Sequence, residues 1–175
     1  MNSFRGLLWM LIAAAGVTIL LFIINQLPSL MHKDYARQYV SIEDARKACG
    51  LDYVLVPAYF PEGMSWPASF IIAQKRPYKA LVTEFRDKAS GQTALIVVQT
   101  SLHGSELQLQ RIKMSEVKQQ NEYQLKGRKA ILQVGTCNNG VSCSRMAWQD
   151  ESGSYAILLM STPFELIRIA ESMVR

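Results

Sequence analysis

The sequence predicts an α+β fold: an N-terminal transmembrane helix, then a curved, mostly antiparallel sheet packed with a short N-terminal helix and a C-terminal helix. Three observations predict it. The chain opens with a long uncharged apolar stretch. Short β-branched runs separated by turn signals follow, as in antiparallel sheets. The chain then closes with the pattern of a capped amphipathic helix, and strands followed by a helix are typical of α+β domains.

The apolar stretch is "GLLWMLIAAAGVTILLFIINQL", residues 6–27. A helix of this length is about 33 Å long, enough to cross the roughly 30 Å hydrocarbon core of a bilayer. A cleavable signal peptide is the alternative, but its apolar region normally has only about 7–15 residues before a small-residue cleavage site. We therefore expect a retained anchor. Within it, Ala14 and Thr18 are four residues apart, a spacing that allows another membrane helix to pack closely.

The expected organisation is a short cytoplasmic tail at 1–5, a transmembrane helix at 6–27, a linker at 28–40 and an extracytoplasmic domain at 41–175. The residues alone leave the orientation open. Lys and Arg near the membrane are more numerous on the domain side, which favours the cytoplasm by the positive-inside rule. That rule weakens for long segments, since large domains translocate largely regardless of charge.

Within the domain, Ser41 as N-cap and Gly50 as C-terminal stop predict a short helix. The run from residue 51 to 56 predicts a strand that ends in a proline-bounded turn, and the polar stretch 106–120 fits either strand or loop. The remaining predicted strands are 69–75, 79–86, 93–100, a strand around 130–134, and a hairpin over 144–161 that turns at "DESG".

The predicted C-terminal helix begins after Thr162, with Pro163 in the first position and Glu165 completing a capping box. Its apolar side chains recur at helical spacing, so we expect this stripe to pack on the sheet. The stripe consists of Phe164, Ile167, Ala170 and Met173 or Val174.

Two stretches carry a family resemblance: "VPAYFPEGMSW" (56–66) and "MAWQDESGSYAILLMSTPFELIRIAESMV" (146–174). Together they resemble a bacterial domain-of-unknown-function family found at the extracytoplasmic end of single-pass anti-sigma-factor-like and sporulation membrane proteins. The resemblance implies a half-barrel related to the LolA-like folds, with no shared catalytic residues. Only "MNSFR" precedes the apolar stretch, so no sigma-binding activity is expected.

The resemblance favours the periplasm or the extracellular space, where thiols oxidise. Cys137 and Cys143 flank "NNGVS", whose Asn-Gly pair favours a tight turn, so a disulfide between them is expected. Free thiols, a metal site and a redox pair are the alternatives. A zinc site needs four ligands, and the other candidates, Cys49, His32 and His103, lie at no finger-like spacing.

No catalytic residue, metal or cofactor is predicted. His103 has serines nearby, but proximity in sequence is not a triad, and no phosphate-binding loop or paired-carboxylate motif occurs. Basic residues are frequent from 111 to 129, which fits either anionic headgroups or a solvated face. The turn at 57–67 carries candidate partner- or lipid-binding side chains, which alternatively cap the sheet as core: Tyr59, Phe60, Met64 and Trp66.

These observations favour a non-catalytic, extracytoplasmic interaction module held by one membrane helix. It would be an accessory subunit or sensor of a larger assembly in the cell inner membrane, with its C-terminal domain on the periplasmic or extracellular side. Its expected partners are the bilayer and other membrane protein subunits, and nucleic acid is not expected. The alternative is an anchored half-barrel that binds lipid or a lipoprotein. An enzyme is the third hypothesis, but the convergent polar residues that it needs are not found in the sequence.

Overall fold

The computed structural model describes residues 16–18, 36–101 and 109–174. The chain divides into two compact units, 1–35 and 36–175. Most of the predicted transmembrane helix, with Ala14, lies outside the described residues, and Thr18 lies in an exposed helical turn. None of the helices in the described ranges is long and apolar enough to cross a membrane.

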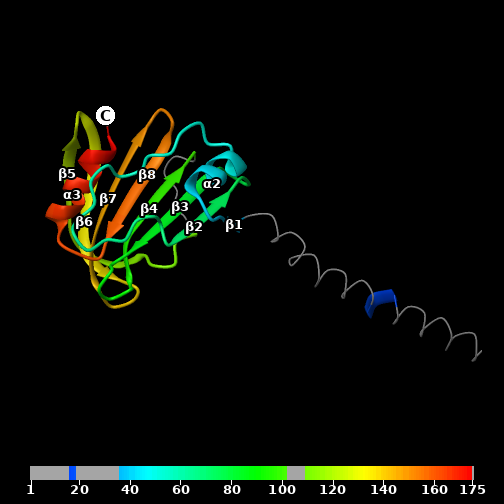
Figure 1. The fold of residues 1–175 in the computed structure, drawn as a ribbon, viewed down its shortest axis with the longest axis horizontal. Helices are drawn as coiled ribbons and strands as arrows, with labels where there is room; N and C mark the ends of the chain where they lie inside the picture. Colours follow the sequence, from blue (N-terminus) through cyan, green and yellow to red (C-terminus); the bar gives the residue numbers. More distant parts are fainter. Residues whose placement is uncertain (1–15, 19–35, 102–108, 175) are drawn as a thin grey trace, which may run out of the picture. The chain divides into compact units, whose positions relative to one another are not determined.

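The second unit contains an eight-stranded antiparallel sheet that does not close on itself (Figure 1). Its strand order is β1-β2-β3-β4-β8-β7-β6-β5, and every pairing between neighbours is antiparallel. The predicted antiparallel sheet is therefore confirmed. The strands are β1 Arg37–Gln38, β2 Phe70–Gln74, β3 Ala80–Arg86, β4 Thr93–Thr100, β5 Met114–Leu125, β6 Arg128–Cys137, β7 Ser142–Asp150 and β8 Gly153–Leu159.

Two helices, α2 (Ile42–Cys49) and α3 (Pro163–Met173), pack on one face of this sheet, called here the helix-bearing face (Figure 1). α2 begins as predicted, because the Ser41 side chain accepts a hydrogen bond from the Asp44 backbone N–H at 3.1 Å. It ends at Gly50, whose φ of 72° is the left-handed conformation that suits glycine. The buried apolar side chains of α3 are Leu166, Ile169, Ala170 and Met173.

Two details of α3 differ from the sequence prediction. Thr162 makes no side-chain capping bond, and the Glu165 side chain accepts a hydrogen bond from the Tyr59 hydroxyl at 2.9 Å. The buried stripe is also rotated from the predicted one, so that Phe164 is 75% exposed. The Tyr59 contact, which comes from a segment distant in sequence, engages the Glu165 side chain that the capping box would need.

The segment 51–69, which connects α2 to β2 in the sequence, crosses the helix-bearing face (Figure 1). The strand predicted at 51–56 is wrong, because side chains rather than a neighbouring strand satisfy this backbone. The Gln99 side chain donates to the Tyr53 carbonyl at 2.8 Å and accepts from the Leu55 N–H at 3.1 Å. Further along, the Ser172 hydroxyl accepts from the backbone N–H groups of Ala58 and Tyr59.

The opposite face of the sheet carries a second apolar cluster, which includes Val82, Ile96 and Leu158. The stretch 109–113 packs on it through Leu109 and Ile112 and contains no strand. The loop reading of the polar stretch therefore holds for these residues, and the strand reading holds from Met114 onward. β5 follows directly and forms one edge of the sheet. Its side chains are mostly exposed, which explains why its polar sequence gave no clear strand pattern.

Candidate functional site

The four predicted binding side chains of the proline-bounded turn lie on or beside the helix-bearing face. Phe60 packs against both Trp66 and Phe85, with ring centres 5.3 and 5.0 Å away, and Trp66 stacks on Phe85 at 5.7 Å. Phe85 is fully buried, whereas Trp66 is 57% exposed. We call Phe60, Trp66 and Phe85 the aromatic cluster; it extends from the buried core to the exposed surface.

Tyr59 has a structural role beside the aromatic cluster. Its hydroxyl donates to Glu165 at 2.9 Å, and this hydrogen bond raises the pKa of the phenol. The Arg168 guanidinium lies 4.3 Å from the centre of the Tyr59 ring. These contacts attach the segment to α3, so Tyr59 helps to hold the adjacent aromatic cluster in place.

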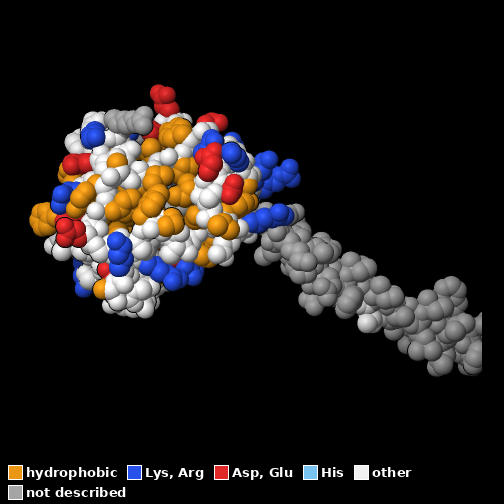
Figure 2. Space-filling view, in the orientation of Figure 1, with side chains coloured by type: hydrophobic (Ala, Val, Ile, Leu, Met, Phe, Trp, Pro, Cys, Tyr) orange, Lys and Arg blue, Asp and Glu red, His pale blue; other side chains and the backbone are white. Residues whose placement is uncertain are grey.

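Met64 completes the turn and is half-buried against the same core. Its backbone N–H donates to the Pro61 carbonyl at 3.3 Å, and it forms an isolated bridge with Asp87 after β3. The bridge to Asp87 therefore ties the turn to the end of β3. In Figure 2 apolar side chains form a band across the helix-bearing face, and the segment that carries the aromatic cluster runs through this face.

A cleft of about 920 Å³ lies mainly on the opposite face, over β8, β7 and β6. Its floor contains a row of cross-strand neighbours in which Val98 pairs with Ala156, Ala156 with Ala147, and Ala147 with Ile131. The two alanines leave space above the middle strands, while Ile131 is 43% exposed. The cleft therefore has a small, apolar centre.

Polar groups surround that centre. Arg145 donates to Gln133 at 2.9 Å, and Gln133 donates to Gln120 at 2.8 Å, which makes a ladder across β7, β6 and β5. The Ser154 hydroxyl is buried beside the cleft without a hydrogen-bond partner among the described residues. Charged lining residues of both signs occur in equal number: Arg128, Lys129 and Arg145 against Glu122, Asp150 and Glu151.

An ion pair between the exposed Arg111 and the buried Glu84 fixes the stretch 109–113 beside this cleft. Arg111 binds the carboxylate of Glu84, which is 1% exposed, and the Thr93 hydroxyl also donates to Glu84 at 3.3 Å. The Arg111 guanidinium lies 4.0 Å from the centre of the Phe70 ring. Its hydrogen bond to Glu84 raises the pKa of the Arg111 guanidinium. The Asn138 side chain donates to the Arg111 carbonyl at 3.2 Å.

Cys137 and Cys143 form a disulfide across the turn between β6 and β7, with their Cα atoms 5.9 Å apart. Both are buried in the cluster of the opposite face. Cys49 is a free, buried thiol on α2. The described residues contain no cluster of three or more side chains suited to a metal ion, and His32 and His103 lie outside them.

Comparisons with protein-family models, with curated proteins and with solved structures find no match. The candidate sites therefore stand on their geometry alone. The sequence indicated the aromatic turn through its crowded apolar residues. It did not indicate the cleft, although the small residues of "MAWQ" and "YAIL" supply its floor once β7 and β8 pair.

Proposed function

We propose that this chain is a single-pass membrane protein whose domain is a non-catalytic extracytoplasmic interaction module, an accessory subunit or sensor of a larger membrane assembly. The uncharged apolar stretch at 6–27 supports the anchor. The disulfide between Cys137 and Cys143 supports the extracytoplasmic side, because disulfides persist in oxidising compartments. The same placement accords with the resemblance to extracytoplasmic domains of single-pass membrane proteins.

The aromatic cluster is the observation that carries the proposal. Trp66 is more than half exposed, yet its ring is held by stacking on a fully buried Phe85. Binding to a side chain that is already ordered loses little conformational entropy, and exposed tryptophans are common anchors of protein interfaces. The occupant that fits is an apolar surface of another protein subunit in the same membrane.

A photo-reactive amino acid in place of Trp66 tests this proposal in intact cells. We expect illumination to give one adduct of discrete mass. The same amino acid in place of Gln124, an exposed residue of edge strand β5, is the matched control and is expected to give none. The absence of an adduct from position 66, with the protein present in the membrane, would contradict the proposal.

The cleft favours a second candidate, an anchored half-barrel that binds lipid or a lipoprotein. Its centre is apolar, and the charges of its lining balance, which suits an acyl chain better than a strongly charged ligand. Mass spectrometry of the protein extracted from its membrane tests this candidate. A lipid-sized adduct that disappears when Ala147→Trp fills the cleft, but persists in Ala89→Trp on the exposed β3–β4 turn, supports it. A chain without any adduct counts against it.

A further inference from the structure

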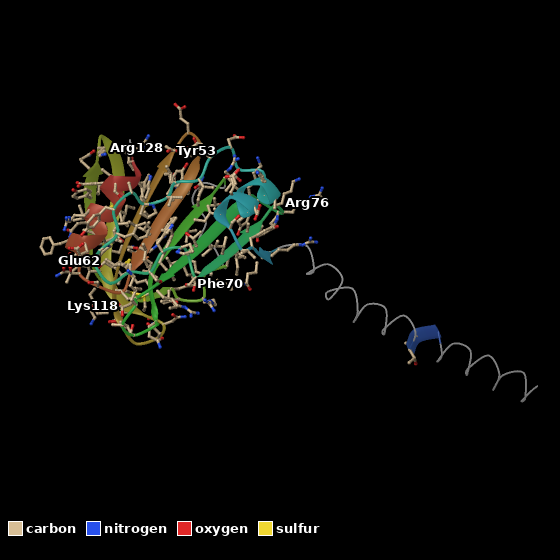
Figure 3. The ribbon with its side chains drawn as sticks, viewed as in Figure 1. Tyr53, Glu62, Phe70, Arg76, Lys118 and Arg128 are labelled. Atoms are coloured by element: carbon tan, nitrogen blue, oxygen red, sulfur yellow. A yellow bond between two sulfur atoms is a disulfide. The ribbon has the colours of Figure 1, made fainter. Side chains whose placement is uncertain are left out.

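Basic side chains gather at the sheet edge where the chain enters the domain. Arg37 lies in β1, Lys75 and Arg76 follow β2, and Lys79 precedes β3. The first three are exposed and Lys79 is half-buried. We call these four residues the basic corner. Figure 2 shows Lys and Arg side chains on this side of the domain, and Figure 3 places Arg76 beside α2.

The strand register explains why residues distant in sequence share this corner. Arg37 pairs with Ala73 in antiparallel register, so the start of β1 lies beside the end of β2. The chain therefore enters at the end of the sheet where the turn 75–79 lies. Lys79 donates from its Nζ to the Gly50 carbonyl at 2.5 Å, which places the C-terminal end of α2 at the same corner.

The charge balance at this corner is positive. The turn between β2 and β3 contains no carboxylate at all. On α2, Glu43 binds Arg46 at 2.7 Å and Lys47 at 3.6 Å, so its charge is largely matched within the helix. Across residues 36–56 and 70–79, six cations (Arg37, Arg46, Lys47, Lys75, Arg76 and Lys79) face three anions (Glu43, Asp44 and Asp52).

The length of the connecting chain limits how far this corner can lie from a membrane. The predicted transmembrane helix ends at residue 27, and residues 28–35 separate it from Ala36. Eight residues span at most about 29 Å when fully extended. The far edge of the sheet, β5, lies seven strand spacings from β1, about 34 Å. A connection of this length allows the β1 edge, where the chain enters the sheet, to reach the bilayer surface.

We propose that the basic corner docks on anionic phospholipid headgroups of the membrane that holds the anchor. This inference rests on the proposed membrane anchoring. Each Lys or Arg close to an anionic bilayer strengthens its association about fivefold. The attraction acts only within a Debye length, about 8 Å at physiological salt, and the short connection allows the basic corner to come that close to the headgroups. Docking turns the β1 edge toward the lipid and leaves the aromatic cluster for a protein partner.

Lysine acetylation tests the proposal on the full chain, reconstituted in nanodiscs of phosphatidylcholine alone or mixed with phosphatidylglycerol. Mass spectrometry then gives the acetylation rate of each lysine. We expect Lys75 to react about fivefold more slowly in the anionic discs, and high salt to remove the difference. Lys118 and Lys129, on the far strands β5 and β6, are expected to react equally in both discs.

Two variants sharpen the test. Arg76→Gln removes one charge of the corner and is expected to abolish most of the protection of Lys75, whereas Lys118→Gln on the far edge leaves it unchanged. Equal rates for Lys75 in the two discs would overturn the docking while leaving the anchor intact. A chain that separates from the discs during purification would instead overturn the anchor, and the docking with it, so the two failures are distinguishable.

Discussion

Glu84 on β3 is almost fully buried and forms an ion pair with Arg111. Arg111 belongs to the stretch 109–113, which packs on the opposite face of the sheet. An isolated carboxylate in such a place is costly, and Arg111 is its only partner of opposite charge among the described residues. The pair therefore attaches the stretch 109–113 to the opposite face, beside the candidate cleft.

Loss of one partner of this pair is expected to destabilise the domain. Arg111→Met leaves the Glu84 charge buried and unpaired, at a cost of about 2–4 kcal/mol in the free energy of unfolding. Urea unfolding measures this cost. The double variant Glu84→Leu with Arg111→Met is the control and is expected to recover most of the loss, because it removes the buried charge as well. A double variant as unstable as the single one would show that packing, rather than charge, holds the stretch.

Reduction of the disulfide is expected to weaken the domain moderately. Cys137 and Cys143 close a loop of seven residues, which corresponds to about 2.4 kcal/mol in the chain-entropy model. Urea unfolding of the variant with both cysteines replaced by alanine measures this contribution. Added reductant should lower the stability of the wild type and leave that variant unchanged. A reductant effect of equal size on both proteins would place its origin elsewhere.

Truncation of Phe60 and truncation of Trp66 are expected to lower the stability of the domain by different amounts. Phe60→Ala removes the ring packed against both Trp66 and Phe85 and should cost about 2–4 kcal/mol of stability. Trp66→Ala should cost only about 1 kcal/mol, because the side chain is more than half exposed. Thermal unfolding separates the two cases. Equal losses would mean that Trp66 serves the core rather than the surface.

Cys49 is expected to be chemically inert in the folded protein. Burial raises the pKa of its thiol above the ordinary value of 9.0, so less thiolate forms at any pH. The thiol of the unfolded chain loses its proton at a lower pH than the buried thiol does. The free energy of unfolding should therefore decline as the pH rises above the ordinary thiol pKa of 9.0. A thiol reagent should modify Cys49 slowly at neutral pH and rapidly in denaturant. Rapid modification of the native protein would contradict the burial.

Much of the sheet was predictable because its buried strands have apolar or alternating runs. β2, β3 and β4 fall within a residue or so of their predicted ranges, and the hairpin of β7 and β8 turns where predicted. β5 was not predictable, because an edge strand with exposed side chains lacks that pattern. β1 has only two residues, too few for any pattern, and it lies within the stretch expected as a linker.

The site was predictable only where its residues are neighbours in the chain. Phe60 and Trp66 stand out within one turn, but the ring that orders them, Phe85, belongs to a distant strand. The cleft depends on the register that places Ala147 beside Ala156, which no local pattern encodes. A contact of this kind, from the Tyr59 hydroxyl, also engages the Glu165 side chain that the predicted capping box of α3 would need.

The central claim is that this chain works as one subunit of a membrane assembly. Native mass spectrometry of the protein, extracted gently from its own membrane, tests that claim most directly. The account predicts additional chains at fixed stoichiometry, which are lost in Trp66→Ala but retained in the control Lys118→Gln. A bare chain, with or without a lipid-sized adduct, would contradict it.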